Sequence, residues 1–154
     1  MRGKIFQGIL FAAAAVMALS LAASGQAQSA SPLPLADAHI HYSHDAWEQL
    51  PPKAAIRLLR QAGLKMAFVS SSSDDGTQML HAAAPDLVVP VLRPYRRRGE
   101  TRSWVHDESV VGMVAARLAK NTYAGIGEFH VFGPDADLAV MRGIVKLAAQ
   151  YKIF

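Results

Sequence analysis

The chain has 154 residues, of which 51% are hydrophobic and 18% are charged, a composition typical of globular proteins rather than disordered ones. It contains no cysteine, which excludes a disulfide framework and a thiolate metal site, so any metal must be held by His, Asp or Glu. The formal net charge is only +4. The short run Arg96-Arg97-Arg98 is expected to be a solvated loop, so nucleic-acid binding is not indicated.

The first 27 residues have the layout of a secretory signal peptide. Arg2 and Lys4 precede an apolar run, and Gly25-Gln26-Ala27 offers the small residues that a signal peptidase reads. A transmembrane anchor is the alternative, but the uncharged run is short for a bilayer and no stop-transfer charges follow it. We therefore predict cleavage after residues 1–27, export to the periplasm or the cell exterior without a stable membrane anchor, and a linker over 28–34.

After the linker, apolar segments with the period of a strand alternate with segments that have the period of a helix. Strands are expected over 35–42, 65–70, 87–92 and 123–132, helices over 51–62, 77–84, 103–120 and from 137 onward, and the start of a fifth strand over 151–154. Gly63 occupies the position of a left-handed helix cap, and Pro90 weakens the third strand. Asp137 is expected to cap the last helix, with Leu138, Met141, Val145 and Ala148 facing inward.

This alternation is typical of βαβ units and predicts an α/β fold with a parallel sheet, because parallel neighbours need a crossover connection. Two architectures remain open, an open doubly wound sheet and part of a (β/α)8 barrel. No G-x-G-x-x-G motif follows the first strand, so a nucleotide-binding sheet has little support. In both architectures the functional residues collect at the carboxyl ends of the strands.

The end of the first strand carries the densest polar motif. Asp37, His39 and His41 are spaced by two residues, so their side chains share one face of the strand. The two histidine backbones lie about 6 to 7 Å apart at the strand rise of about 3.3 Å per residue, which two imidazoles can close around one ion. Two histidines at this spacing also occur by chance on loops and exposed strands, so the motif alone does not establish a metal site.

The end of the fourth strand strengthens the metal hypothesis. Glu128 and His130 also share one face there, after the glycines of GIGEFH. A carboxylate that ends an otherwise apolar strand is costly unless it is paired or coordinated. His39, His41 and Glu128 are therefore the candidate ligands of a divalent ion, with zinc favoured and manganese or iron as alternatives.

These residues resemble the metal-dependent amidohydrolase superfamily, including its amidohydrolase-related and TatD-like branches. The D-x-H-x-H of Asp37, His39 and His41 resembles the first-strand motif whose histidines bind the more buried metal, and Glu128 stands where some branches place a bridging glutamate. The resemblance implies a metal-dependent hydrolase in which the metal activates a water molecule. It also implies that residues 35–154 are the N-terminal part of a barrel, with about five parallel strands.

The departure from this family concerns length. Such barrels have about 250 residues, and the histidines expected from strands five and six and the aspartate expected from strand eight have no counterpart in this sequence. An apolar ending such as that of 151–154 is a poor sheet edge. We therefore expect a truncated gene product, whose activity as it stands is left open, and a coding sequence that continues beyond codon 154 would support this expectation.

Several further residues have more than one interpretation. Arg93, at the end of the third strand, could bind an anionic group of a small-molecule substrate or be a solvated rim residue, and His130 is a second candidate for contact with that substrate. His44 and Asp45 could touch substrate but are expected to cap the turn before Trp47. Among the remaining polar residues, Asp74 and Asp75 indicate a turn, and His81 and His106 are expected on the surface.

Two functions remain open. The first is a metal-dependent hydrolase of amidohydrolase type. The second is a non-enzymatic exported α/β module that binds a partner or a small ligand, for which 154 residues is an ordinary domain size.

Overall fold

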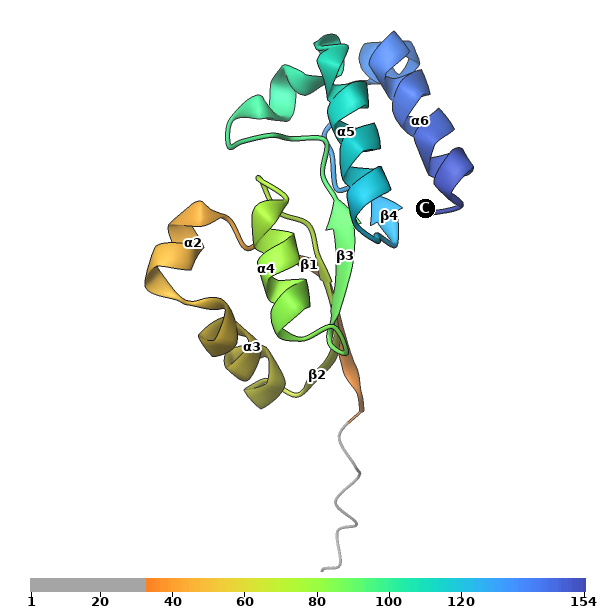
Figure 1. Cartoon of the computed structure of the whole chain (residues 1–154). Coiled ribbons are helices and arrows are strands. Elements are labelled where there is room, and N and C mark those ends of the chain that lie inside the picture. Colours follow the sequence, from red (N-terminus) through yellow and green to blue (C-terminus); the bar gives the residue numbers. More distant parts are fainter. Residues whose placement is uncertain (1–32) are drawn as a thin grey trace, which may run out of the picture. The chain divides into compact units, whose positions relative to one another are not determined.

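Four parallel strands form a curled half-barrel sheet in residues 33–154, which are the residues that the computed structural model describes (Figure 1). The strands follow one another in sequence order and are β1 (Leu35–Ile40), β2 (Leu64–Val69), β3 (Val88–Leu92) and β4 (Gly125–Ile126). The α/β class and the parallel sheet are confirmed, whereas a five-stranded partial barrel is not. The predicted signal peptide and most of the predicted linker lie outside the described residues.

Helices connect successive strands. They are α2 (His44–Gln49), α3 (Pro52–Gln61), α4 (Asp75–Ala83), α5 (Ser109–Lys120) and α6 (Ala139–Tyr151), with short 3-10 turns at Glu100–Arg102, Trp104–His106 and Gly133–Asp137. Gly63 has a φ of +85°, which confirms the predicted left-handed position after α3. Gly76 in α4 lies so close to the chain after β1 that a Cβ would stand 1.7 Å from the carbonyl oxygen of Tyr42. Only glycine allows this approach, which fixes α4 against the segment that leads out of β1.

Two apolar clusters hold the helices to the sheet. The first joins α3 and α4 to β2 and β3 and contains Tyr42, Ala55, Ile56, Ala67, Val69, Leu80, Ala84, Leu87 and Val88. The second gathers around α5, α6 and the loop after β3 and contains Leu92, Tyr95, Trp104, Val105, Val110, Val114, Leu118, Tyr123, Ile126, Val140, Met141 and Ile144. The opposite face of the sheet is less covered, since Met66 on β2 is 43% exposed.

The fourth strand is shorter than predicted. Its ladder with β3 ends with Leu92 paired to Ile126 and one further bond from the Gly127 amide to the Leu92 carbonyl. Pro94 lies two residues after β3, the partner strand, and has no amide hydrogen to continue the ladder. The apolar residues Phe129 and Val131 pack on the second cluster instead, so their pattern reflects burial rather than strand pairing.

Two helices also differ from the prediction. The predicted helix 103–120 begins only at Ser109, because the carboxylate of Asp107 accepts hydrogen bonds from the Ser109 amide and hydroxyl and so starts α5 there. Asp137 does not cap α6, whose N-cap Leu138 makes no side-chain capping bond. Val145, predicted to face inward, is 62% exposed, because the buried face of α6 runs through Val140, Met141 and Ile144.

The predicted fifth strand is not formed. Tyr151 is the last residue of α6, and Lys152 adopts a left-handed conformation with φ of 55°. The amide of Phe154 nevertheless donates to the Ala124 carbonyl at 3.2 Å, and the Ile126 amide donates to the Phe154 carbonyl at 2.8 Å. This pair of bonds is that of a parallel bridge, so Phe154 lies beside β4 on the side away from β3.

A buried polar link joins the two clusters. Asp74 is 4% exposed and accepts a hydrogen bond of 2.6 Å from the phenol of Tyr123, with a guanidinium nitrogen of Arg117 at 3.7 Å. Burial raises the pKa of the Asp74 carboxyl, although the hydrogen bonds from Tyr123 and Gln78 and the charge of Arg117 oppose the increase. Asp74 therefore stabilises the fold. It is more than the turn residue expected from the sequence, and it does not belong to the cluster of His39, His41 and Glu128.

We expect replacement Asp74→Asn to change the pH dependence of stability. The folded protein favours the neutral form of the Asp74 carboxyl, so its pKa is higher in the folded than in the unfolded chain. The resulting stabilisation of the folded state is fully present below the unfolded pKa of 3.8 and is lost as the pH rises through the folded pKa. As the pH rises, the free energy of unfolding of the wild type should fall relative to that of the Asn variant. The fall should be about 1.4 kcal/mol for each unit by which the pKa of Asp74 differs between the folded and the unfolded state. Urea unfolding from pH 3 to pH 7 measures this, with the exposed neighbour variant Asp75→Asn as control; a constant difference would contradict it.

Candidate metal centre

Three predicted ligands converge at the carboxyl end of the sheet. His39 lies in β1, His41 follows β1, and Glu128 follows β4. The two Nε2 atoms are 2.9 Å apart, and Glu128 Oε2 lies 2.8 Å from Nε2 of His39 and 3.2 Å from Nε2 of His41. The structure thus brings together the three side chains that the sequence selected, from the first and last strands of the half-barrel.

The ring of His41 is oriented by a neighbouring strand. Its Nδ1 donates a hydrogen bond to the backbone carbonyl of Ser70, which directly follows β2. This bond places the ring proton on Nδ1 and leaves the lone pair of Nε2 directed toward His39 and Glu128. Metal-binding histidines are commonly oriented by such a hydrogen bond. Ser70 was not predicted as a site residue, since a backbone carbonyl has no signature in the sequence.

Hydrogen-bond acceptors face one another in this cluster. With its proton on Nδ1, the His41 Nε2 is an acceptor, and the Glu128 carboxylate is an acceptor too, so their 3.2 Å contact sets one lone pair against another. One proton on His39 can serve only one of these neighbours. Glu128 Oε2 is buried and has no hydrogen bond of acceptable geometry to any group in the described chain. An added proton would relieve one contact, whereas a shared cation would relieve all three.

The donor set suits a divalent ion. Two imidazole nitrogens and one carboxylate oxygen are ligands of zinc, manganese and iron. Ligand atoms about 2.1 Å from one ion are about 3.4 Å apart at the tetrahedral angle and about 3 Å apart at right angles, and the separations of 2.8, 2.9 and 3.2 Å in this cluster lie close to the smaller value. The residues therefore fit a metal, and three donors leave coordination positions for water and substrate.

Arg93 lies behind Glu128 and is buried. Its side chain is 9% exposed, with Nη2 at 3.7 Å from Glu128 Oε2 and Nε donating a 3.1 Å hydrogen bond to the Glu128 carbonyl. The guanidinium also stacks on the Tyr95 ring, with its central carbon 4.6 Å from the ring centroid. Of the two interpretations left open by the sequence, the solvated rim arginine is wrong. Arg93 positions Glu128 and brings positive charge to the site.

His130 lies at the margin of the cluster. Its Nε2 is 4.0 Å from Glu128 Oε1 and its side chain is 55% exposed. The Tyr95 hydroxyl contacts its Nδ1 at 3.1 Å and accepts a 2.7 Å hydrogen bond from its amide, while the indole of Trp104 donates to its carbonyl at 3.0 Å. Burial raises the pKa of the Tyr95 phenol, so Tyr95 stays a neutral support for His130.

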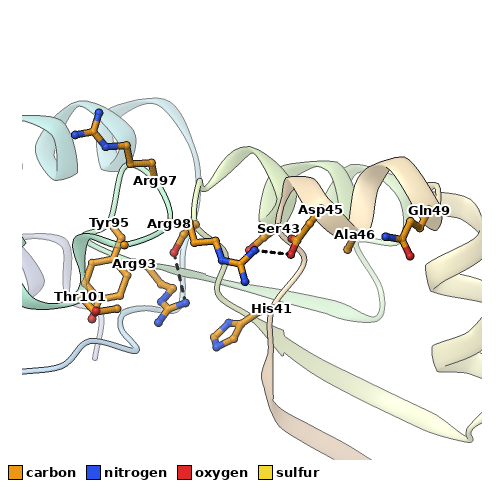
Figure 2. A pocket seen from close by; sticks show the side chains of 12 residues that line it. His41, Ser43, Asp45, Ala46, Gln49, Arg93, Tyr95, Arg97, Arg98 and Thr101 are labelled. Carbon is orange, nitrogen blue, oxygen red and sulfur yellow. Dashed lines mark hydrogen bonds and ion pairs between the residues drawn. The ribbon is translucent and has the colours of Figure 1, made fainter.

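A cavity of about 550 Å³ adjoins the metal cluster, because His41 belongs to both and Arg93, which lies next to Glu128, also lines the cavity (Figure 2). Its walls come from α2 and from the loop after β3, and its complete lining is His41, Ser43, Asp45, Ala46, Gln49, Ser72, Arg93, Tyr95, Arg97, Arg98, Gly99 and Thr101. This volume is in the range of small-molecule sites. A second hollow of about 360 Å³ is lined by His39 and Glu128 of the cluster together with apolar residues that include Phe68, Val91 and Phe154.

Several residues that line this cavity were not singled out in the sequence analysis or were given another role there. Asp45 was expected to cap a turn, but it lines the cavity and forms a 3.0 Å ion pair with Arg98. His44 packs its ring against Trp47 and does not line the cavity. Tyr95 had one usable signal, since it follows Arg93 by two residues at a strand end. The pairing of Asp45 with Arg98 had none, because 53 positions separate them.

Comparison with known proteins gives no assignment. No protein-family model matches the chain, and no curated protein and no solved structure matches it either. Within the described residues, none of the helices combines the length and apolar composition needed to cross a bilayer.

Proposed function

We propose that this protein is an exported metal-dependent hydrolase of amidohydrolase type. The observation that carries the proposal is the convergence of His39, His41 and Glu128, whose ligand atoms all lie within 4.8 Å of one another. Their position at the carboxyl ends of parallel strands supports it, since this is where barrel enzymes carry their chemistry. Export through the predicted signal peptide belongs to the same proposal, and an exported chain that begins at residue 28 would support it.

In this proposal His39, His41 and Glu128 hold the ion, with zinc as the first candidate and manganese or iron as alternatives. A divalent ion at this place supplies Lewis acidity, which lowers the pKa of a water molecule toward neutrality and polarises a carbonyl or phosphoryl group. The family resemblance implies further ligands, namely histidines from later strands and a final aspartate. Among the described residues, the ligand cluster consists of His39, His41 and Glu128 alone.

The other residues have positioning and binding roles. Ser70 holds His41 in the tautomer that exposes Nε2. Arg93 anchors the backbone of Glu128 through its Nε, so the carboxylate stays aimed at the two imidazoles. His130 presents an exposed ring beside Glu128, where it can donate to or accept from a substrate group.

The test joins metal analysis with hydrolysis by the full chain. We expect about one divalent ion per chain, metal-dependent cleavage of a substrate in a panel of amides, esters, lactones and phosphoesters, and loss of cleavage after chelation. Glu128→Gln should bind the ion at least about 100-fold more weakly, more than loss of an outer-shell partner costs. The exposed Glu48→Gln variant should match the wild type.

The possible outcomes separate the two functions that the sequence left open. A purified chain that neither contains nor takes up a divalent ion would contradict the hydrolase. A chain that binds the ion through the three ligands but cleaves nothing in the panel would favour the exported binding module.

A further inference from the structure

The cavity beside the metal cluster has a cationic lining. Arg93, Arg97 and Arg98 line it together with a single acidic residue, Asp45, so positive charge exceeds negative charge. Figure 2 shows the side chain of Arg97 directed away from His41, whereas Arg98 reaches toward Asp45 and Arg93 lies near His41. The arginines that matter for the interior of the cavity are therefore Arg93 and Arg98.

Arg93 carries a buried side chain whose terminal nitrogens make only long contacts. Its Nε is satisfied by the Glu128 carbonyl at 3.1 Å, but its terminal nitrogens have only long contacts, 3.5 Å to the Ser72 hydroxyl and 3.7 Å to Glu128 Oε2. A buried guanidinium is costly unless its donors are paired. If Glu128 shares its charge with a metal ion, Arg93 has still less compensation. Arg93 lines the cavity, and its terminal nitrogens can donate hydrogen bonds to a planar or tetrahedral oxyanion there.

Arg98 faces the same space from the rim. Its side chain is 74% exposed and its Nη1 lies 3.0 Å from Asp45 Oδ2. An exposed ion pair of this kind is weak, about 0 to 1 kcal/mol, so an incoming anion can compete with Asp45 for the guanidinium. Arg98 can thus close on a ligand whose anionic group already contacts Arg93, and Asp45 opposes this step.

We infer that this cavity binds the oxyanion group, carboxylate or phosphate, of a small molecule, and that Arg93 and Arg98 hold this group while Asp45 competes for Arg98. The statement that this molecule is a substrate rests on the proposed function. His41 belongs to both the cavity and the ligand cluster, so an anion bound to Arg93 would place the rest of the molecule toward the metal ligands. The binding of an anion itself requires no metal.

The experiment titrates the chelator-treated full chain with inorganic phosphate and, separately, with succinate, and measures affinity by calorimetry at fixed low ionic strength. We expect saturable binding of at least one of the two ions; the tighter one shows whether the substrate carries a phosphate or a carboxylate. Arg98→Gln should weaken binding about tenfold, as loss of a charged hydrogen bond does. Asp45→Asn should strengthen it several-fold, because it frees Arg98 and removes the competing charge.

Arg102→Gln is the matched control, because Arg102 lies in the same connection between β3 and α5, is exposed and does not line the cavity. It removes the same charge and should change the affinity less than twofold. Failure of both ions to bind, equal weakening by Arg102→Gln and Arg98→Gln, or weakening by Asp45→Asn would overturn the inference. All proteins are measured free of metal, so a failure here leaves the hydrolase proposal to its own test of metal content, and a failure of metal binding leaves this result standing.

Discussion

The double variant His39→Ala/His41→Ala should lose its bound metal and every activity that depends on it. It removes two of the three ligands and leaves Glu128 alone, which cannot hold a divalent ion against water at ordinary concentrations. A ligand that binds only the folded state at 100 times its Kd stabilises by about 2.7 kcal/mol. Zinc should therefore raise the Tm of the wild type but not that of the double variant, as metal analysis and thermal unfolding can measure.

The single variants should differ in a direction set by the geometry. The His41 side chain is 35% exposed and oriented by Ser70, whereas that of His39 is 59% exposed. A pre-oriented ligand loses less entropy on binding, so His41→Ala should weaken metal binding more than His39→Ala. His106→Ala, an exposed histidine that pairs with Asp135 at 3.7 Å, is the control and should retain the ion. A double variant with the metal content and Tm response of the wild type would contradict the site.

The sequence could predict the order and type of the larger elements, because their apolar periods extend over enough residues. The helices α3, α4 and α6 begin and end within a few residues of the prediction. The six-residue helix α2 was missed, since fewer than two turns carry no measurable period. The fourth strand was predicted too long because a run of apolar residues looks the same whether it pairs in a sheet or packs in a core. The strand ends where its partner β3 ends, at the pair Leu92 and Ile126, and this limit cannot be read from the run itself.

The site was predictable to the extent that it follows from topology. Parallel strands bring their carboxyl ends to one edge, so His39, His41 and Glu128 could be selected from the sequence alone. His130 was placed on the face of Glu128 by assuming a strand, but no strand extends beyond Ile126, and the ring reaches only the margin of the cluster. The burial of Arg93 and the contact of Arg98 with Asp45 depend on how loops fold over one another, which no local pattern encodes.

Replacement Trp104→Ala should have the largest effect on stability. Trp104 is fully buried, and its ring packs against Tyr95 and Phe129 with centroid distances of 6.0 and 5.3 Å. Removing a buried Trp typically costs 3–5 kcal/mol, about half of the stability of an ordinary domain. The full-length variant should unfold at a much lower urea concentration than the wild type.

Two further variants separate packing from hydrogen bonding. Trp104→Phe keeps most of the ring but removes the indole donor to the His130 carbonyl, which should cost about 1 to 3 kcal/mol. Phe132→Ala, at a side chain that is 56% exposed, should stay within about 0.5 kcal/mol of the wild type. If Trp104→Ala destabilised the protein no more than Phe132→Ala does, the second cluster would not be the core. Because Trp104 and Tyr95 both bind His130, a true core here means that the segment that follows Glu128 rests on packed side chains rather than on a loose loop.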